Sequence, residues 1–223
     1  MSSSIQRQKI EAREACILAA AGQVFSEAGF DGARMADIAR RAEIAEGTLY
    51  LYYKNKQDLL DAVVAKFWGD LTIGAENAFD TTLPALAQLA ALAEYHLHAI
   101  IDDFAIVGFT YRGTNNQADQ RRDQVRHYVR VFDQILRRGI DRGDVHPDVV
   151  IWQARDIFYG TLEFSARTLV LRGVNFDESV VTNLISLMRT SYWKIEQTHN
   201  HATPLDEVLV RLARIEAALE SGG

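Results

Sequence analysis

Cysteine, proline and long apolar runs are scarce in this sequence. Cys16 is the one cysteine among 223 residues, which excludes an internal disulfide and predicts a reducing cytoplasm, with Cys16 as a small buried filler. Prolines occur only at positions 84, 147 and 204, and long stretches without helix breakers favour helix. No apolar run approaches a membrane span, and residues 1–11 contain no apolar signal core. We therefore expect neither membrane insertion nor secretion.

Basic charge is also in the minority. Twenty-four Lys and Arg residues stand against 30 Asp and Glu residues, for a net charge of −6, which by itself argues against a nucleic-acid partner. The charge is uneven, because residues 1–56 contain eight basic and seven acidic residues, whereas residues 57–223 contain sixteen and twenty-three. Phosphate would repel the acidic part but not the N-terminal part. If this chain binds DNA, we expect residues 1–56 to do so.

Apolar residues recur three and four positions apart along most of the chain, which predicts an all-α protein of about nine or ten helices. The short apolar segment at 104–112 is interpreted as helix, although a buried strand would look similar. We expect a small N-terminal bundle in residues 1–56 and a larger helical domain in residues 57–223. The helices are expected at about 5–28, 34–42, 46–52, 56–78, 84–101, 104–112, 116–142, 148–172, 177–198 and 204–220.

The last of these helices has an apolar seam with heptad spacing, formed by Leu205, Val208, Leu212, Ile215 and Leu219. Two heptads are too short to hold a coiled coil alone. The favoured interpretation is an amphipathic helix on its own domain, and pairing with a partner subunit is the alternative.

The second and third short helices, joined by a tight turn, have the organisation of a DNA-binding helix-turn-helix over about 34–53. Such a unit can present its third helix to the major groove. Its core requires Ile38, Ala39, Leu49 and Tyr53 to point inward, while the outward positions contact phosphates and base edges.

Residues 10–60 resemble the TetR family of transcription regulators. The positions that carry the resemblance are Ile38, Ala39, Arg40, Arg41, Ala42, Ile44, the run from Gly47 to Lys56, Leu59 and Leu60, with Ala20, Ala21, Phe25, Gly29 and Phe30 upstream. The resemblance implies a homodimer that binds double-stranded DNA at a palindromic operator. It also implies a repressor that a small apolar ligand releases, without a cofactor or an enzymatic activity.

The resemblance and the charge pattern together suggest a set of DNA contacts. These are Arg34, Glu46, Gly47, Thr48, Tyr50, Tyr52 and Lys56. Three positions depart from the family pattern. Arg34 and Ala45 replace residues that usually cap the second and third helices, and Glu43 replaces a turn glycine and is expected to need a positive φ.

The larger domain is expected to bind the ligand and to form the dimer. Polar residues within apolar helices are the candidates for the ligand pocket: His96, Tyr111, Arg112, Tyr128, Trp152, Asp156, Tyr159 and Glu163. Apolar residues of the helices near 148–172 and 177–197 are the candidates for a four-helix dimer interface: Phe158, Leu162, Phe164, Leu169, Leu184, Leu187, Met188 and Tyr192.

The stretches 47–60 and 132–140 are similar to regulators of fatty-acid breakdown that respond to acyl-CoA, which suggests an acyl-CoA or a fatty-acid-like inducer. Two other function classes are the alternatives. A helical enzyme is disfavoured because the sequence lacks a nucleophile motif, a glycine-rich phosphate loop and metal-ligand spacing. His96 and His98 lie on different helix faces, so no metal is expected. A carrier or partner protein that retains the motif as a relic is the remaining alternative.

Overall fold

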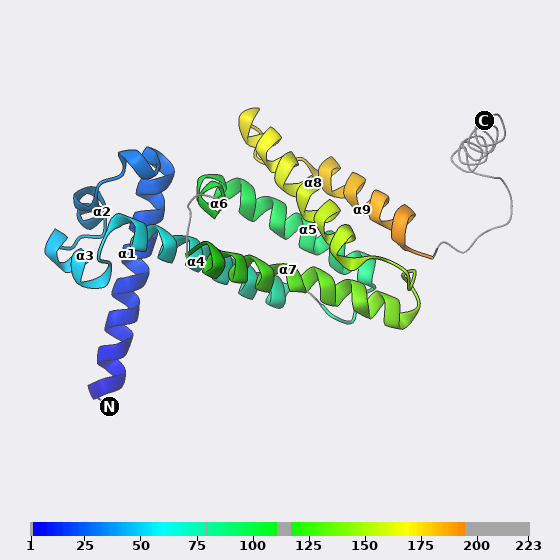
Figure 1. The fold of residues 1–223 in the computed structure, drawn as a ribbon, viewed down its shortest axis with the longest axis horizontal. Helices are drawn as coiled ribbons and strands as arrows, with labels where there is room; N and C mark the ends of the chain where they lie inside the picture. Colours follow the sequence, from blue (N-terminus) through cyan, green and yellow to red (C-terminus); the bar gives the residue numbers. More distant parts are fainter. Residues whose placement is uncertain (1, 79, 111–116, 195–223) are drawn as a thin grey trace, which may run out of the picture. The chain divides into compact units, whose positions relative to one another are not determined.

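The computed structural model describes residues 2–78, 80–110 and 117–194, and this part of the chain is helical with no strand (Figure 1). One isolated bridge pairs Val145 with Trp193. The all-α expectation is therefore confirmed, and the segment at 104–110 is a helix. The helices are α1 (Ser2–Gly32), α2 (Met35–Arg41), α3 (Glu46–Tyr52), α4 (Lys56–Ala78), α5 (Ala85–Asp102), α6 (Phe104–Thr110), α7 (Gln117–Arg142), α8 (Ile151–Leu171) and α9 (Glu178–Tyr192).

Most helix boundaries fall within a few residues of the expected positions. The first helix kinks at Gly29 (φ 68°), as expected for a glycine at a helix end, but one more turn continues to Gly32. The last described helix ends earlier than predicted. Trp193 becomes extended and the Tyr192 carbonyl accepts a hydrogen bond from the His146 N–H (3.0 Å), so the chain leaves the helix there. The helix expected at 204–220 lies outside the described residues.

The first three helices pack around a small apolar core. Ile38, Ala39 and Leu49 have at most 1% exposure, and Tyr53 is also buried, so the expected inward positions are confirmed. The Tyr53 hydroxyl donates to Glu14 of α1 (3.0 Å), and Arg41 of α2 forms an ion pair with Glu27 of α1 (2.7 Å). These two contacts fix both short helices against α1.

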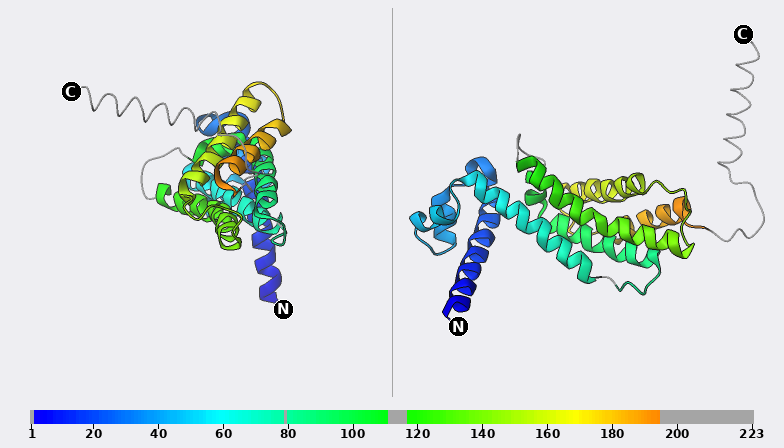
Figure 2. Two further views of the ribbon diagram at one scale, coloured as in Figure 1. Left: turned by 90° about the vertical axis from the view of Figure 1, so that its right-hand side faces the viewer. Right: turned by 60° about the horizontal axis from the view of Figure 1, so that its bottom comes forward.

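Helices α4 to α9 form a larger bundle in which α5 lies between the α4–α7 pair and the α8–α9 pair (Figures 1 and 2). Large side chains from four helices fill its centre, among them Trp68, Phe132 and Phe158. The buried carboxylate of Asp133 on α7 accepts from the Arg155 guanidinium on α8 (3.1 and 3.2 Å). This ion pair fixes α7 against α8 inside the bundle.

Helix α4 connects the two groups, because it contacts both α1 and α7. Phe25 of α1 also meets Phe109 of α6 edge to face at 6.2 Å. By contacts, residues 1–193 form one compact unit, so a functional division near residue 56 stays a prediction. Within the described residues, no helix is long and apolar enough to cross a membrane.

Candidate functional site

The exposed side of α3 follows from the position of its one fully buried residue. Successive residues of an α-helix are about 100° apart, so Gly47 and Leu51 lie roughly opposite Leu49. Leu49 has 0% exposure, whereas Leu51 is 84% exposed and Gly47 is also exposed. The side of α3 that faces away from the core is therefore centred on positions 47 and 51.

The other expected DNA contacts are distributed around this centre. Glu46 and Tyr50 are exposed on one flank, and Thr48 is half-buried on the other. Tyr52 is half-buried and packs against the core. Arg34 is exposed at the start of α2. The accessible side of α3 therefore has Gly47 at its centre, with Tyr50 and the half-buried Thr48 on its opposite flanks, and Arg34 is exposed just before α2.

Lys56 has a different environment from the one expected of a phosphate ligand. Its ammonium donates to the carbonyl oxygens of Ala33 (2.9 Å) and Asp31 (3.4 Å), and it lies 4.6 Å from the centre of the Phe30 ring. The positive charge thus satisfies carbonyl groups at the end of α1. In this conformation Lys56 joins α4 to α1.

The unusual helix starts predicted from the sequence are present. Neither Arg34 before α2 nor Ala45 before α3 makes a side-chain capping hydrogen bond. Glu43 has a positive φ of 55°, which lets the Ile44 N–H donate to the Ala39 carbonyl (3.0 Å). Such a bond closes the end of α2 as a left-handed glycine usually does, at a cost of about 1 kcal/mol for a residue with a side chain.

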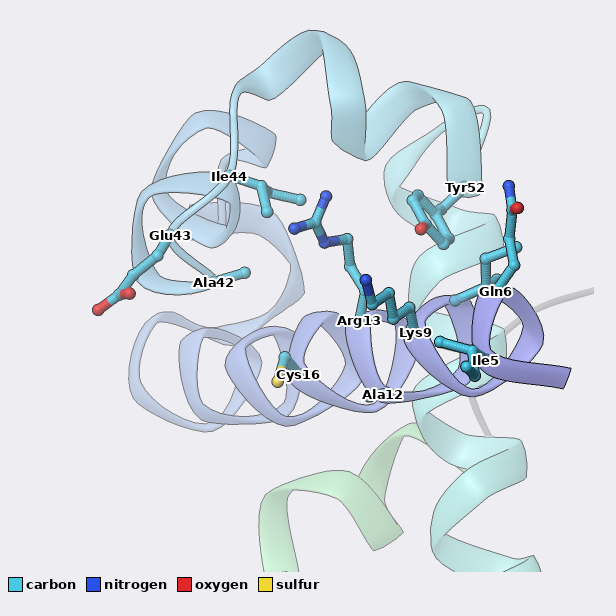
Figure 3. Close-up of a pocket in the computed structure, with 11 residues that line it drawn as sticks. Ile5, Gln6, Lys9, Ala12, Arg13, Cys16, Ala42, Glu43, Ile44 and Tyr52 are labelled. Atoms are coloured by element: carbon cyan, nitrogen blue, oxygen red, sulfur yellow. The ribbon is translucent and has the colours of Figure 1, made fainter. Parts of the chain in front are cut away.

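An open groove of about 810 Å³ lies between α1 and the α2–α3 turn. In Figure 3 the side chains of Lys9 and Arg13 rise from α1 into this groove, and Tyr52 lies across it. Cys16 borders the same groove and is exposed, so its expected role as a buried filler is wrong. The reason is that α1 turns Ile17, the next residue, towards the core.

Three of the ligand-pocket candidates meet inside the larger bundle. His96 on α5, Tyr128 on α7 and Tyr159 on α8 are buried, and the His96 Nδ1 lies 2.8 Å from the Tyr128 hydroxyl. The His96 ring stacks on Tyr128 at 5.5 Å and meets Tyr159 edge to face at 4.9 Å. We call these three residues the polar core cluster.

Burial controls the ionisation of this cluster. It lowers the pKa of His96 to about 3, because the charged imidazolium would lose its hydration. Burial also raises the pKa of Tyr128 and of Tyr159. At neutral pH the cluster is therefore uncharged, and the His96 Nε2 has no hydrogen-bond partner among the described residues.

The remaining pocket candidates do not join this cluster. Trp152 is 56% exposed and the Asp156 side chain is 63% exposed, so both lie on the outer side of α8. Glu163 is half-buried. Tyr111 and Arg112 lie outside the described residues. Among the described residues, no group of three or more His, Cys, Asp or Glu side chains could hold a metal.

The candidates for the dimer interface also differ in burial, because some are buried and others are exposed. Five of them are buried in the protomer's own core: Phe158, Leu162, Leu169, Leu184 and Met188. A side chain without exposed surface cannot contribute buried area to a dimer. We therefore assign these five residues to the core of the protomer and not to the interface. Tyr192 is half-buried, while Phe164 (74%) and Leu187 (49%) are exposed.

Two exposed apolar residues of α8, Ile157 and Leu171, had not been selected from the sequence. They lie seven positions on either side of Phe164, so all three share one side of the helix. This spacing is visible in the sequence. The sequence alone could not show which apolar side of α8 is exposed, because the side that faces the core is apolar too.

Comparison with known proteins gives two family matches. Residues 17–63 match the bacterial regulatory proteins of the tetR family, and residues 70–190 match the C-terminal region of YsiA-like proteins. The fatty acid metabolism regulator protein of Bacillus subtilis is 27% identical over 173 residues, which cover 76% of this chain and 89% of that protein. The two family models together therefore match parts of both the small bundle and the larger one.

Solved structures share the fold. FadR from Bacillus subtilis in complex with stearoyl-CoA superposes with a TM-score of 0.70 at 23% identity, over 78% of this chain and 96% of that one. The ketosteroid regulator KstR2 of Mycobacterium tuberculosis superposes with a TM-score of 0.62 at 21% identity, over 82% of this chain and 96% of that one. Residues 17–63, which match the tetR model, contain α2 and α3, and this chain belongs to the tetR family of bacterial regulatory proteins, whose members bind DNA.

Proposed function

We propose that the chain is a sequence-specific transcriptional repressor, which a small apolar ligand releases from a palindromic operator. The observation that carries the proposal is the exposed side of α3, opposite the buried Leu49, which has Gly47 at its centre and Tyr50 and Thr48 on its two flanks. A hydroxyl at Thr48 and another at Tyr50 suit phosphate oxygens and base edges.

Two copies of α3 are needed to recognise a palindrome. A dimer with recognition helices about 34 Å apart would place them in successive major grooves. The exposed apolar side of α8, together with Leu187 of α9, supports a dimer built from these two helices. The predicted division of labour follows, with residues 1–56 for DNA and the larger bundle for ligand and dimer.

The polar core cluster supports a ligand that is mostly apolar with one polar group. His96 is surrounded by aromatic and aliphatic side chains, and its free Nε2 could bond to a carbonyl or hydroxyl group of a ligand. The similarity to a fatty acid metabolism regulator favours an acyl-CoA or a fatty-acid-like molecule. The ligand would act by favouring a dimer in which the distance between the two copies of α3 no longer matches the spacing of the major grooves.

The DNA-binding part of the proposal is tested with Gly47→Glu. A Cβ added at Gly47 meets no atom within 4 Å beyond its chain neighbours and its own helix backbone, so the variant should fold, yet its carboxylate would face the phosphates. We expect DNA binding to the region upstream of its own gene to weaken at least about a hundredfold in a footprint at low salt. Gly69→Glu on α4 is the matched control, because Gly69 is equally open and the added charge is the same. Equal binding by the two variants would contradict this surface.

The ligand part is tested by titration with acyl-CoAs from octanoyl-CoA to stearoyl-CoA. We expect at least one of them to raise the Tm and to release DNA, and His96→Gln to weaken this response. His98→Gln is the control, because His98 is exposed two positions away on the same helix. If no member of the series releases DNA or raises the Tm, the proposed ligand class is wrong.

A further inference from the structure

Leu51 is the most exposed of the large apolar side chains in the described chain, at 84%. It lies in the middle of the last turn of α3, on the side opposite the buried Leu49. We propose that Leu51 reads the C5-methyl group of a thymine in the major groove and so determines part of the operator sequence. This inference rests on the proposed DNA-binding function and adds to it a residue that selects a base.

Leu51 is the more exposed of the two large exposed apolar side chains of α3, at 84% against 47% for Tyr50. Gly47 shares this side of the helix one turn earlier and carries no side chain, and a Cβ built there meets nothing within 4 Å. In the described part of the chain, no side chain therefore crowds this side of α3 at Gly47. The backbone at Gly47 can approach the DNA closely, and Leu51 then enters the groove.

The chemistry of Leu51 restricts what it can read. Its side chain has no donor or acceptor, so it cannot bond to the polar edges of guanine, cytosine or adenine. The thymine methyl group is the apolar feature that the major groove offers. Contact between the two removes apolar surface from water on both sides, which would otherwise stay exposed.

A protein partner is a weaker explanation for this exposed leucine. Within residues 33–60, the large exposed apolar side chains are Leu51 and its neighbour Tyr50. Docking surfaces for proteins usually present a contiguous apolar patch of several residues. A single leucine beside hydroxyl-bearing residues fits a base edge better.

The experiment uses the full-length protein and an operator obtained by in vitro selection. Each thymine of the operator is replaced in turn by deoxyuridine, which removes only the methyl group and keeps the base pairing. Dissociation constants are measured at fixed salt for the wild type, Leu51→Ala and Leu51→Met. Ile73→Ala serves as the matched control, because Ile73 is an exposed aliphatic residue of α4 away from the helix-turn-helix (58%).

We expect one thymine per half-site at which deoxyuridine weakens wild-type binding by about fourfold, the effect of one buried methyl group. The same replacement should leave Leu51→Ala unchanged, while Leu51→Met and Ile73→Ala should keep the dependence. The slope of affinity against salt should be equal for the wild type and Leu51→Ala, since an apolar contact releases no counterions.

Two results overturn the inference and have different meanings. If the wild type selects a defined operator but no thymine methyl matters, or it matters equally in Leu51→Ala, then Leu51 does not read thymine and the DNA-binding function stands. If the wild type selects no sequence above the random pool, the proposed function fails, and the role of Leu51 fails with it.

Discussion

The ammonium group of Lys56 lies between two carbonyl oxygens and an aromatic ring, although its sequence position indicated a phosphate ligand. The contacts with Ala33, Asp31 and Phe30 attach the first residue of α4 to the end of α1. Lys56, predicted from the sequence to contact DNA, therefore has contacts within the protein that stabilise the fold. Loss of DNA binding in a Lys56 variant would therefore not by itself prove a phosphate contact.

Replacing Lys56 by alanine tests this structural role. The variant loses a charged hydrogen bond and a cation–π contact, so we expect the free energy of unfolding to fall by about 1–2 kcal/mol. Urea denaturation measures the change without DNA. Lys54→Ala is the control, because Lys54 is exposed, and it should change stability by less than about 0.5 kcal/mol. Equal effects of the two substitutions would contradict the structural role.

His96 gives the protein a specific pH dependence. Its pKa is lowered from 6.5 to about 3 in the folded state. As the pH falls below 6.5, the unfolded chain takes up a proton that the folded chain does not, so stability decreases by up to about 1.4 kcal/mol per pH unit. This loss continues until the pH approaches 3, and above about 7 His96 contributes no pH dependence.

The measurement compares denaturation curves of the wild type and His96→Gln between pH 7.5 and 5. We expect the wild type to lose stability as the pH falls and His96→Gln to show a slope smaller by close to one proton. If the two curves had the same slope, His96 would be accessible to protons in the folded state.

Among the helices, the contact between α4 and α5 depends on a glycine. Tyr95 of α5 packs against Gly74 of α4, and its hydroxyl donates to the carbonyl of Leu71 (3.3 Å). A Cβ at Gly74 would overlap the Tyr95 hydroxyl, whereas a Cβ at Gly69 of the same helix would meet nothing within 4 Å. Packing against Tyr95 therefore requires a glycine at position 74, whereas the surroundings of position 69 leave room for a side chain.

Substitution by alanine at each position tests this difference. Gly69→Ala should stabilise the protein by about 0.5–1 kcal/mol, because alanine favours helix more than glycine does. Gly74→Ala should instead destabilise it by about 1 kcal/mol or more, because Tyr95 must move and its hydrogen bond to Leu71 is lost. Thermal denaturation of both variants decides the matter, and stabilisation by both would show that Tyr95 yields at little cost.

At the scale of the whole molecule, α8 has two apolar sides. One contains Phe158 and Leu162 and belongs to the protomer core, and the other exposes Ile157, Phe164 and Leu171. Exposed apolar surface on a regulator that is proposed to bind a palindrome is best explained by a second copy of the chain.

Phe164→Glu tests this interpretation. Two carboxylates would approach each other across a two-fold interface, and we expect dimer affinity to fall by roughly a hundredfold, about 2.7 kcal/mol. Light scattering after gel filtration should show a monomer, and operator binding should be lost with it. Leu83→Glu is the control, because Leu83 is also exposed (43%) and precedes α5 rather than lying on α8. A dimer that survives Phe164→Glu would place the interface elsewhere.

Local signals in the sequence were sufficient for the helices and the helix-turn-helix. Apolar spacing defined the helices, and the pattern around Ile38 and Leu49 defined which side of α2 and α3 is buried. The positive φ of Glu43 and the missing cap at Ala45 also followed, because they depend only on neighbours in the chain.

The tertiary structure decided the environment of each side chain where helices from distant segments meet. The choice between the two apolar sides of α8 required α5, α7 and α9, since burial depends on which helix packs against which side. His96, Tyr128 and Tyr159 come together from three helices. Leu51 emerged as a candidate reader in the same way, because a helical pattern indicates that a residue faces outward, while the packing around α3 shows how much of it remains exposed.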